Sequence, residues 1–78
     1  MNDYGIGQIV STILSLTDTI MKKLPDYDQK KKETFYKFKR AYENERSKDY
    51  KLRDDNLLDF YRERLLDFAQ TFSEEINK

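Results

Sequence analysis

The segment 30–40 carries the side chains best suited to binding a negatively charged ligand. Its eleven residues hold six bases, one acid and three aromatic residues. Bases in this number can neutralise phosphate groups, and neighbouring aromatic rings can stack on nucleobases. A solvated helix face, matched in charge to an acidic helix elsewhere in the chain, explains the same residues, and we favour that interpretation. The candidate nucleic-acid-binding residues are Lys30, Lys31, Lys32, Lys37, Lys39 and Arg40.

Acidic residues gather at two places, and either group is chemically suited to a hard cation. Asp26 and Asp28 follow the single proline, and Asp54, Asp55 and Asp59 lie further along the chain. Neither group has the spaced ligands and the glycine of a calcium-binding loop. Both stand where the start of a helix prefers carboxylates. We therefore predict helix capping at both places, and no metal site.

Side chains for catalysis are scarce. The chain has no Cys and no His, so thiol nucleophiles and imidazole bases are excluded. Asp59 and Glu63 share one helix face, but general acid–base catalysis needs a carboxyl group whose pKa is raised beside a pocket. Gly5 and Gly7 lack the strand–helix context of a phosphate-binding loop. We predict that the protein is not an enzyme and that it uses no cofactor or small-molecule substrate.

Length and charge set the scale of the fold that positions these residues. A chain of 78 residues forms one small domain and buries only about 60% of the surface that it exposes when unfolded. Fifteen bases balance fifteen acids, so no overall field attracts DNA or an anionic membrane. The balance is uneven along the chain, because residues 26–53 hold ten bases and six acids, whereas residues 54–78 hold three bases and seven acids.

The pattern of apolar residues predicts an all-α fold of three helices, over about residues 3–24, 28–47 and 55–76. The first is an amphipathic aliphatic helix within residues 1–25, which ends where Pro25 restricts the preceding residue. The basic second helix and the acidic third helix form an antiparallel hairpin within residues 26–78. Because residues 47–53 contain no Gly or Pro, one long bent helix across them stays open as an alternative.

The second and third helices carry narrow apolar seams that predict the hairpin core. One seam contains Phe35, Phe38 and Tyr42, and the other contains Leu58, Tyr61, Leu65, Phe68 and Phe72. Burial of these side chains, at about 25 cal/mol per Å², must supply the stability. Exposed ion pairs between the helices contribute only about 0–1 kcal/mol each, so they select the antiparallel orientation.

The first helix has a wide aliphatic face that the hairpin need not cover completely. Three interpretations stay open: packing on the hairpin, association with a second copy or another protein, and contact with a membrane surface. Its polar face is rich in Ser and Thr and poor in bases, which favours protein contact. The uncharged run covers only residues 4–17, whereas a membrane span needs about 20 residues. The candidate partner-binding residues are Ile6, Ile9, Val10, Ile13, Leu16 and Ile20.

The order of these segments resembles small phage-encoded helical accessory proteins of unknown role, which are often carried near lysis or structural genes. Three segments carry the resemblance: the aliphatic residues 6–24, the proline and acids of residues 25–30, and the acidic and leucine-rich residues 54–60. The resemblance implies a short viral accessory or virion protein that works through contacts. It also implies a location in the virion or the host cytoplasm, with membrane association left open.

These observations together predict a non-enzymatic assembly protein that acts through its first helix, as a minor virion component or a lysis-associated accessory protein. Two alternatives stay open. The first is a nucleic-acid-binding module that uses the bases of residues 30–40. The second is an inhibitor of a host or defence protein, whose acidic third helix occupies a basic groove through Asp54, Asp55, Asp59, Glu63 and Asp67.

Overall fold

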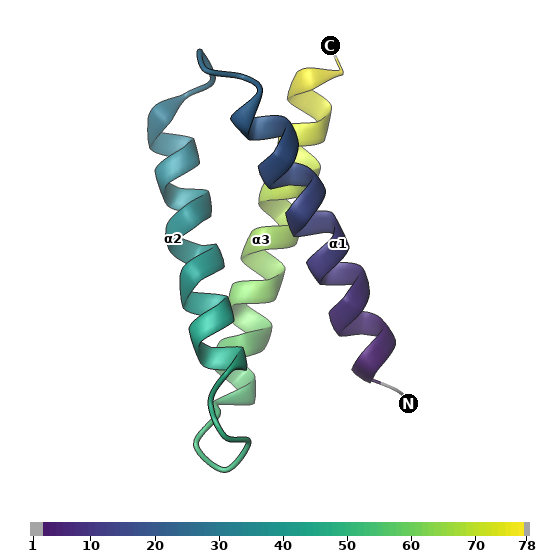
Figure 1. Ribbon diagram of the computed structural model, residues 1–78, viewed down its shortest axis with the longest axis vertical. Coiled ribbons are helices and arrows are strands. Elements are labelled where there is room, and N and C mark those ends of the chain that lie inside the picture. The colour runs from purple at the N-terminus through teal and green to yellow at the C-terminus, as the bar shows by residue number, and fades with distance from the viewer. Residues whose placement is uncertain (1–2, 78) are drawn as a thin grey trace.

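Three helices make up the computed structural model, which describes residues 3–77 and, from residue 7 onward, their side chains. The helices are α1 (Asp3–Lys22), α2 (Gln29–Arg46) and α3 (Asp55–Ile76), and no strand occurs among the described residues. They run up, down and up, so that the start of α1 lies at the same end as the α2–α3 loop (Figure 1). The predicted all-α fold is confirmed.

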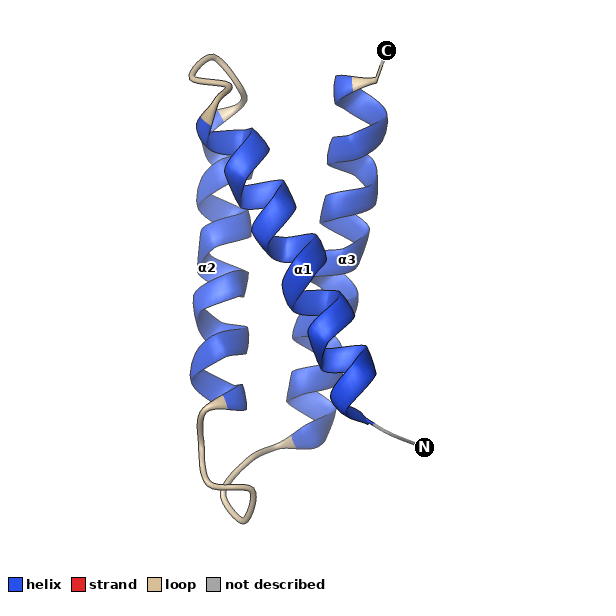
Figure 2. Ribbon diagram, turned by 45° about the vertical axis from the view of Figure 1, so that its right-hand side comes forward, coloured by secondary structure: helices blue, strands red, loops and turns tan. Residues whose placement is uncertain are grey.

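The hairpin of α2 and α3 is the frame of the molecule. Its helices lie antiparallel and side by side, and the segment between them is a loop (Figures 1 and 2). The alternative of one continuous bent helix is therefore wrong. Aromatic rings join the two helices, with ring centroids 5.1 Å apart for Phe35 and Phe68 and 6.0 Å apart for Phe38 and Tyr61.

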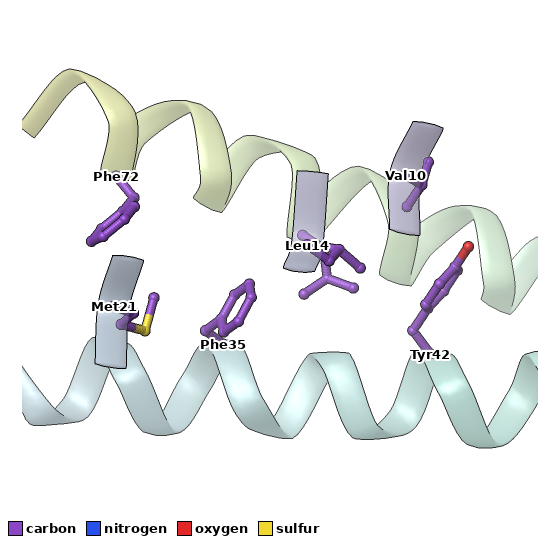
Figure 3. Close-up of a cluster of buried hydrophobic side chains, with 7 residues drawn as sticks. Val10, Leu14, Met21, Phe35, Tyr42 and Phe72 are labelled. Carbon is purple, nitrogen blue, oxygen red and sulfur yellow. The ribbon is translucent and has the colours of Figure 1, made fainter. Parts of the chain in front are cut away.

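Helix α1 crosses the hairpin diagonally and closes the core against it (Figure 2). Val10, Leu14 and Met21 point from α1 toward the hairpin, where they meet side chains of α2 and α3 (Figure 3). The core from the hairpin consists of Phe35, Tyr42, Leu65, Ala69 and Phe72. Burying one large apolar side chain stabilises a fold by about 1.5–3 kcal/mol, so each large side chain of this cluster contributes on that scale.

Aspartates begin the second and third helices, as the sequence predicts. The Asp28 Oδ1 atom accepts the backbone N–H groups of Lys30 (2.9 Å) and Lys31 (3.3 Å). The Asp54 Oδ1 atom accepts the backbone N–H of Leu57 at 3.1 Å, so Asp54 is the residue that caps α3. Each carboxylate satisfies a donor that has no partner within its own helix.

Helix α1 ends at Lys22, two residues before the predicted end. Pro25 disfavours the helical conformation at residue 24, so the last turn tightens instead. The backbone N–H of Leu24 donates to the Met21 carbonyl at 3.1 Å, three residues back, and the Lys32 ammonium donates to the Leu24 carbonyl at 2.8 Å. A side chain of α2 therefore completes the end of α1.

Candidate protein-binding site

Helix α1 carries two apolar seams that have the same spacing and differ in register by one residue. The inner seam is Val10, Leu14, Thr17 and Met21, and all four side chains are buried. The outer seam is Ile9, Ile13, Leu16 and Ile20. Both follow steps of four, three and four residues, which is the spacing that lets one helix pack along another. The hairpin covers the inner seam.

The outer seam contains four of the six predicted partner-binding residues and leaves them largely uncovered. The exposed fraction is 61% for Ile9 and 59% for Leu16. Ile20 is also exposed, and Ile13 is partly buried. Ile6 continues the spacing, but its side chain lies outside the described residues.

Val10 does not lie on this exposed face. Its exposed fraction is 2%, and it packs in the core beside Leu14. The interpretation of Val10 as a partner-binding residue is therefore corrected. Successive residues of a helix point about 100° apart, so Val10 cannot share the direction of Ile9 once the inner seam faces the hairpin.

An apolar groove between α1 and α3, which we call the α1–α3 groove, continues the outer seam. It has a volume of about 480 Å³, and no charged side chain is among the described residues that line it. From α1 it takes three residues of the outer seam and Thr17. From α3 it takes Leu66, Ala69, Gln70, Phe72, Ser73 and Ile76. The exposed aliphatic surface therefore spans two helices.

The three threonine hydroxyl groups of α1 donate hydrogen bonds within the helix. Thr12 donates to the Gln8 carbonyl at 2.9 Å, and Thr19 donates to the Ser15 carbonyl at 2.8 Å. The buried Thr17 donates to the Ile13 carbonyl at 2.8 Å. Because these donors already have partners, a second apolar surface can cover α1 without leaving them unpaired.

Two contacts hold α1 in this rotation. The Arg46 guanidinium of α2 donates to the Ser11 hydroxyl at 2.9 Å, on the polar side of α1. Tyr36 of α2 faces Asp18 of α1, and burial, followed by the nearby carboxylate, raises the pKa of Tyr36. Both contacts keep the polar side of α1 toward α2 and leave the outer seam away from it.

Ion pairs and hydrogen bonds clamp the two ends of the hairpin. At one end the buried Glu45 carboxylate accepts the Asp54 backbone N–H at 2.8 Å and the Lys48 ammonium at 2.9 Å. The Asp54 hydrogen bond is the first cause that lowers the pKa of Glu45, and the one from Lys48 is the second. At the other end Glu75 accepts the Tyr27 hydroxyl (3.1 Å) and the Lys31 ammonium (3.0 Å).

The predicted nucleic-acid-binding residues do not form one uninterrupted surface. Lys31 pairs with Glu75, Lys32 donates to the Leu24 carbonyl, and Lys39 pairs with Glu43 at 3.2 Å. These three bases therefore make contacts within the chain. Lys30, Lys37 and Arg40 remain exposed on α2.

The acidic residues proposed for an inhibitor surface are similarly divided. Asp54 caps α3, Asp55 pairs with Arg53 at 3.4 Å, and Asp59 pairs with Arg62. Glu63 and Asp67 are exposed further along α3. In the part of the chain that the structure describes, no three acidic side chains gather where they could hold a metal ion.

Within residues 3–77, no helix combines the length and the apolarity that a membrane crossing requires. Comparisons with protein-family models, curated proteins and solved structures found no match to this chain. The resemblance to phage accessory proteins therefore stays a prediction.

The sequence located the outer seam but could not show which seam faces the hairpin. It also did not reveal Glu45, which lies between Asn44 and Arg46 near the end of a basic helix. The one relevant pattern is a glutamate two residues before the loop, with the aspartate that caps α3 nine residues further on.

Proposed function

We propose that the protein is a small assembly protein that associates with a second copy of itself through the outer seam of α1. One observation carries this proposal. Ile9, Leu16 and Ile20 lie exposed on one stripe with helix-packing spacing, while a separate seam of the same helix already fills the core. Packing within the single chain therefore does not explain why the exposed positions of the outer seam are aliphatic.

The hydrophobic effect favours the burial of this surface against a partner. Aliphatic area gains about 25 cal/mol per Å² when it leaves water, and contiguous exposed apolar patches mark interaction sites. The seam and the α1–α3 groove form such a patch, since the groove contains the outer seam residues Ile13, Leu16 and Ile20 together with Ile76 of α3. Single apolar residues scattered over a surface are common and would not indicate an interaction site.

A second copy is the partner that the chemistry of the surface favours. The described residues that line the groove are uncharged, so two copies bring no like charges together. Isoleucine at positions 13 and 20 and leucine at position 16 match the alternation of β-branched residues and leucine in two-stranded helix pairs, whereas Ile9 stands at a leucine position. A minor virion component or a lysis-associated accessory protein, the role that the phage resemblance implies, would assemble through this surface.

Substitution of one exposed seam residue tests the proposal. Leu16→Glu places a charge in the proposed interface, and it leaves the core intact because Leu16 is mostly exposed. Ser15→Glu is the matched control, since it adds the same charge to the exposed polar side of α1. We expect the solution mass from light scattering to fall for Leu16→Glu and to stay unchanged for Ser15→Glu. Equal masses for Leu16→Glu and the unmodified protein would refute the proposal.

A further inference from the structure

A second apolar groove lies between α2 and α3, on the side of the hairpin that α1 does not cover. We call it the α2–α3 groove. It has a volume of about 600 Å³, and the described residues that line it come from α2, α3 and the loop before α2, with none from α1. Its apolar lining consists of Tyr27, Phe35, Phe38, Phe60, Leu65, Phe68 and Phe72.

Phe60 lines this groove, and α2 and α3 leave its ring partly uncovered. Its exposed fraction is 45%, although its ring lies 6.4 Å from that of Phe38 between ring centroids. The Arg64 guanidinium covers part of the ring, 5.3 Å from its centroid. A half-exposed phenylalanine beside a largely aromatic lining offers apolar area to a further surface.

The charged residues that line the groove are Lys30, Lys31, Arg64, Asp67 and Glu75, and further exposed charges stand beside it on both helices. Lys30 and Lys37 stand seven residues apart on α2 and form what we call the basic stripe. On α3, Glu63, Asp67 and Glu74 lie within about 40° of one another at 100° per residue, and they form the acidic stripe. All five side chains are exposed, and none forms an ion pair with another described residue.

We propose that the α2–α3 groove binds the same groove of a second copy, related by a two-fold axis that runs parallel to the helices. This axis lays α2 of one copy over α3 of the other. Helix α2 contains seven bases and three acids, and α3 contains two bases and six acids, so net charges of +4 and −4 meet twice. An axis across the helices would lay α2 on α2 and α3 on α3, which opposes like charges.

The register of the hairpin makes the charge match specific. An axis parallel to the helices keeps every residue at its own height. Lys37 lies beside Phe38, which contacts Phe60 and Tyr61, so its height on α3 is close to that of Glu63. Lys30 lies beside Lys31, which pairs with Glu75, so its height is close to that of Glu74. The basic stripe of one copy therefore faces the acidic stripe of the other.

Side-chain size supports the same arrangement. Ala41 follows Lys37 by four residues, so it continues the basic stripe along α2 with a side chain of one carbon atom. Its height on α3 is near that of Phe60, because Phe38 and Phe60 are in contact one turn away. The exposed ring of one copy thus meets the smallest side chain of that stripe in the other.

Charge exchange tests this proposal independently of the outer seam. Every protein in the test carries Leu16→Glu, which disables the seam interface. The acidic variant adds Lys30→Glu with Lys37→Glu, and the basic variant adds Glu63→Lys with Glu74→Lys. We expect the Leu16→Glu parent to reach a dimer of about 19 kDa, twice the 9.5 kDa chain mass. Each charge variant alone is expected to be monomeric, and an equal mixture of the two to form the dimer again.

The mixture separates this proposal from an effect on folding, because mixing cannot repair a misfolded chain, and circular dichroism checks the helix content of each variant. A parent that stays at 9.5 kDa at high concentration, as it would if the groove bound another protein, overturns the proposal. Charge variants that do not associate on mixing overturn it as well. The proposed function fails by a different result, namely equal masses for the unmodified protein and Leu16→Glu.

Discussion

Glu45 and Asp54 form a relay across the loop between α2 and α3. The Glu45 carboxylate accepts the backbone N–H of Asp54 at 2.8 Å, and the Asp54 carboxylate in turn accepts the backbone N–H of Leu57 at 3.1 Å. The end of α2 therefore holds the residue that begins α3. The eight residues of this loop, 47–54, include no glycine or proline, and a buried carboxylate supplies the acceptor that fixes its exit.

This relay predicts a specific acid sensitivity. The pKa of Glu45 is lowered in the folded protein, so the folded state binds this proton less readily than the unfolded state. Its contribution to stability is therefore present above the ordinary glutamate pKa and is lost as the pH falls through the lowered value. For Glu45→Gln, we expect a lower Tm at neutral pH and a smaller change of Tm with pH in this acid range.

The measurement is the Tm by circular dichroism between neutral and acid pH. Glu43→Gln is the control, because Glu43 is an exposed residue of the same helix in an ion pair with Lys39. Identical Tm profiles for Glu45→Gln and Glu43→Gln would show that the relay does not stabilise the hairpin.

The raised pKa of Tyr27 predicts that the protein loses stability at alkaline pH. Burial, followed by the hydrogen bond to Glu75, raises the pKa of Tyr27 from 10.0 to about 12. A raised pKa gives stability that is complete below the unfolded value of 10.0 and is lost as the pH rises toward about 12. Tyr27→Phe removes one hydrogen bond, which costs about 1 kcal/mol at neutral pH.

Urea unfolding at neutral pH and above pH 10 tests this prediction. We expect the difference in unfolding free energy between the unmodified protein and Tyr27→Phe to shrink as the pH rises. Tyr50→Phe is a suitable control, because Tyr50 is exposed in the α2–α3 loop. A difference that grows at alkaline pH would contradict the assigned direction of the shift.

A comparison of two leucines, one in the core and one on the surface, tests the assignment of the core. Leu65 is fully buried between the helices, whereas Leu52 is exposed in the loop. Leu65→Ala removes the same atoms as Leu52→Ala but leaves a cavity, so it should cost about 2–5 kcal/mol. The change at Leu52 should stay within about 0.5 kcal/mol. Denaturant unfolding measures both values, and similar costs for the two variants would show that the core is assigned wrongly.

Much of the fold could be predicted from the sequence because local signals agree with one another. Pro25 ends the first helix, aspartates 28 and 54 provide caps, and apolar steps of three and four residues mark the core-facing sides of α2 and α3. The opposite net charges of the two hairpin helices indicated their pairing. These features act within a few residues or along one helix, so a single sequence displays them.

The rotation of α1 could not be predicted, and Thr17 explains why. The outer seam contains only aliphatic residues, whereas the inner seam includes a threonine, so hydrophobicity alone favours the outer seam as the core. Thr17 is nevertheless buried, because its hydroxyl donates to the Ile13 carbonyl within the helix and needs no outside partner. The choice between the seams rests on contacts with the hairpin, such as that between Arg46 and Ser11, which lie 35 residues apart.

The solution mass of the unmodified protein, measured by light scattering over a wide range of concentration, tests the central claim most directly. Assembly through the outer seam predicts a mass above 9.5 kDa that falls toward this value on dilution, and that exceeds the mass of Leu16→Glu at the same concentration. A mass of 9.5 kDa at every concentration, up to the highest that the protein tolerates, would contradict self-association through α1.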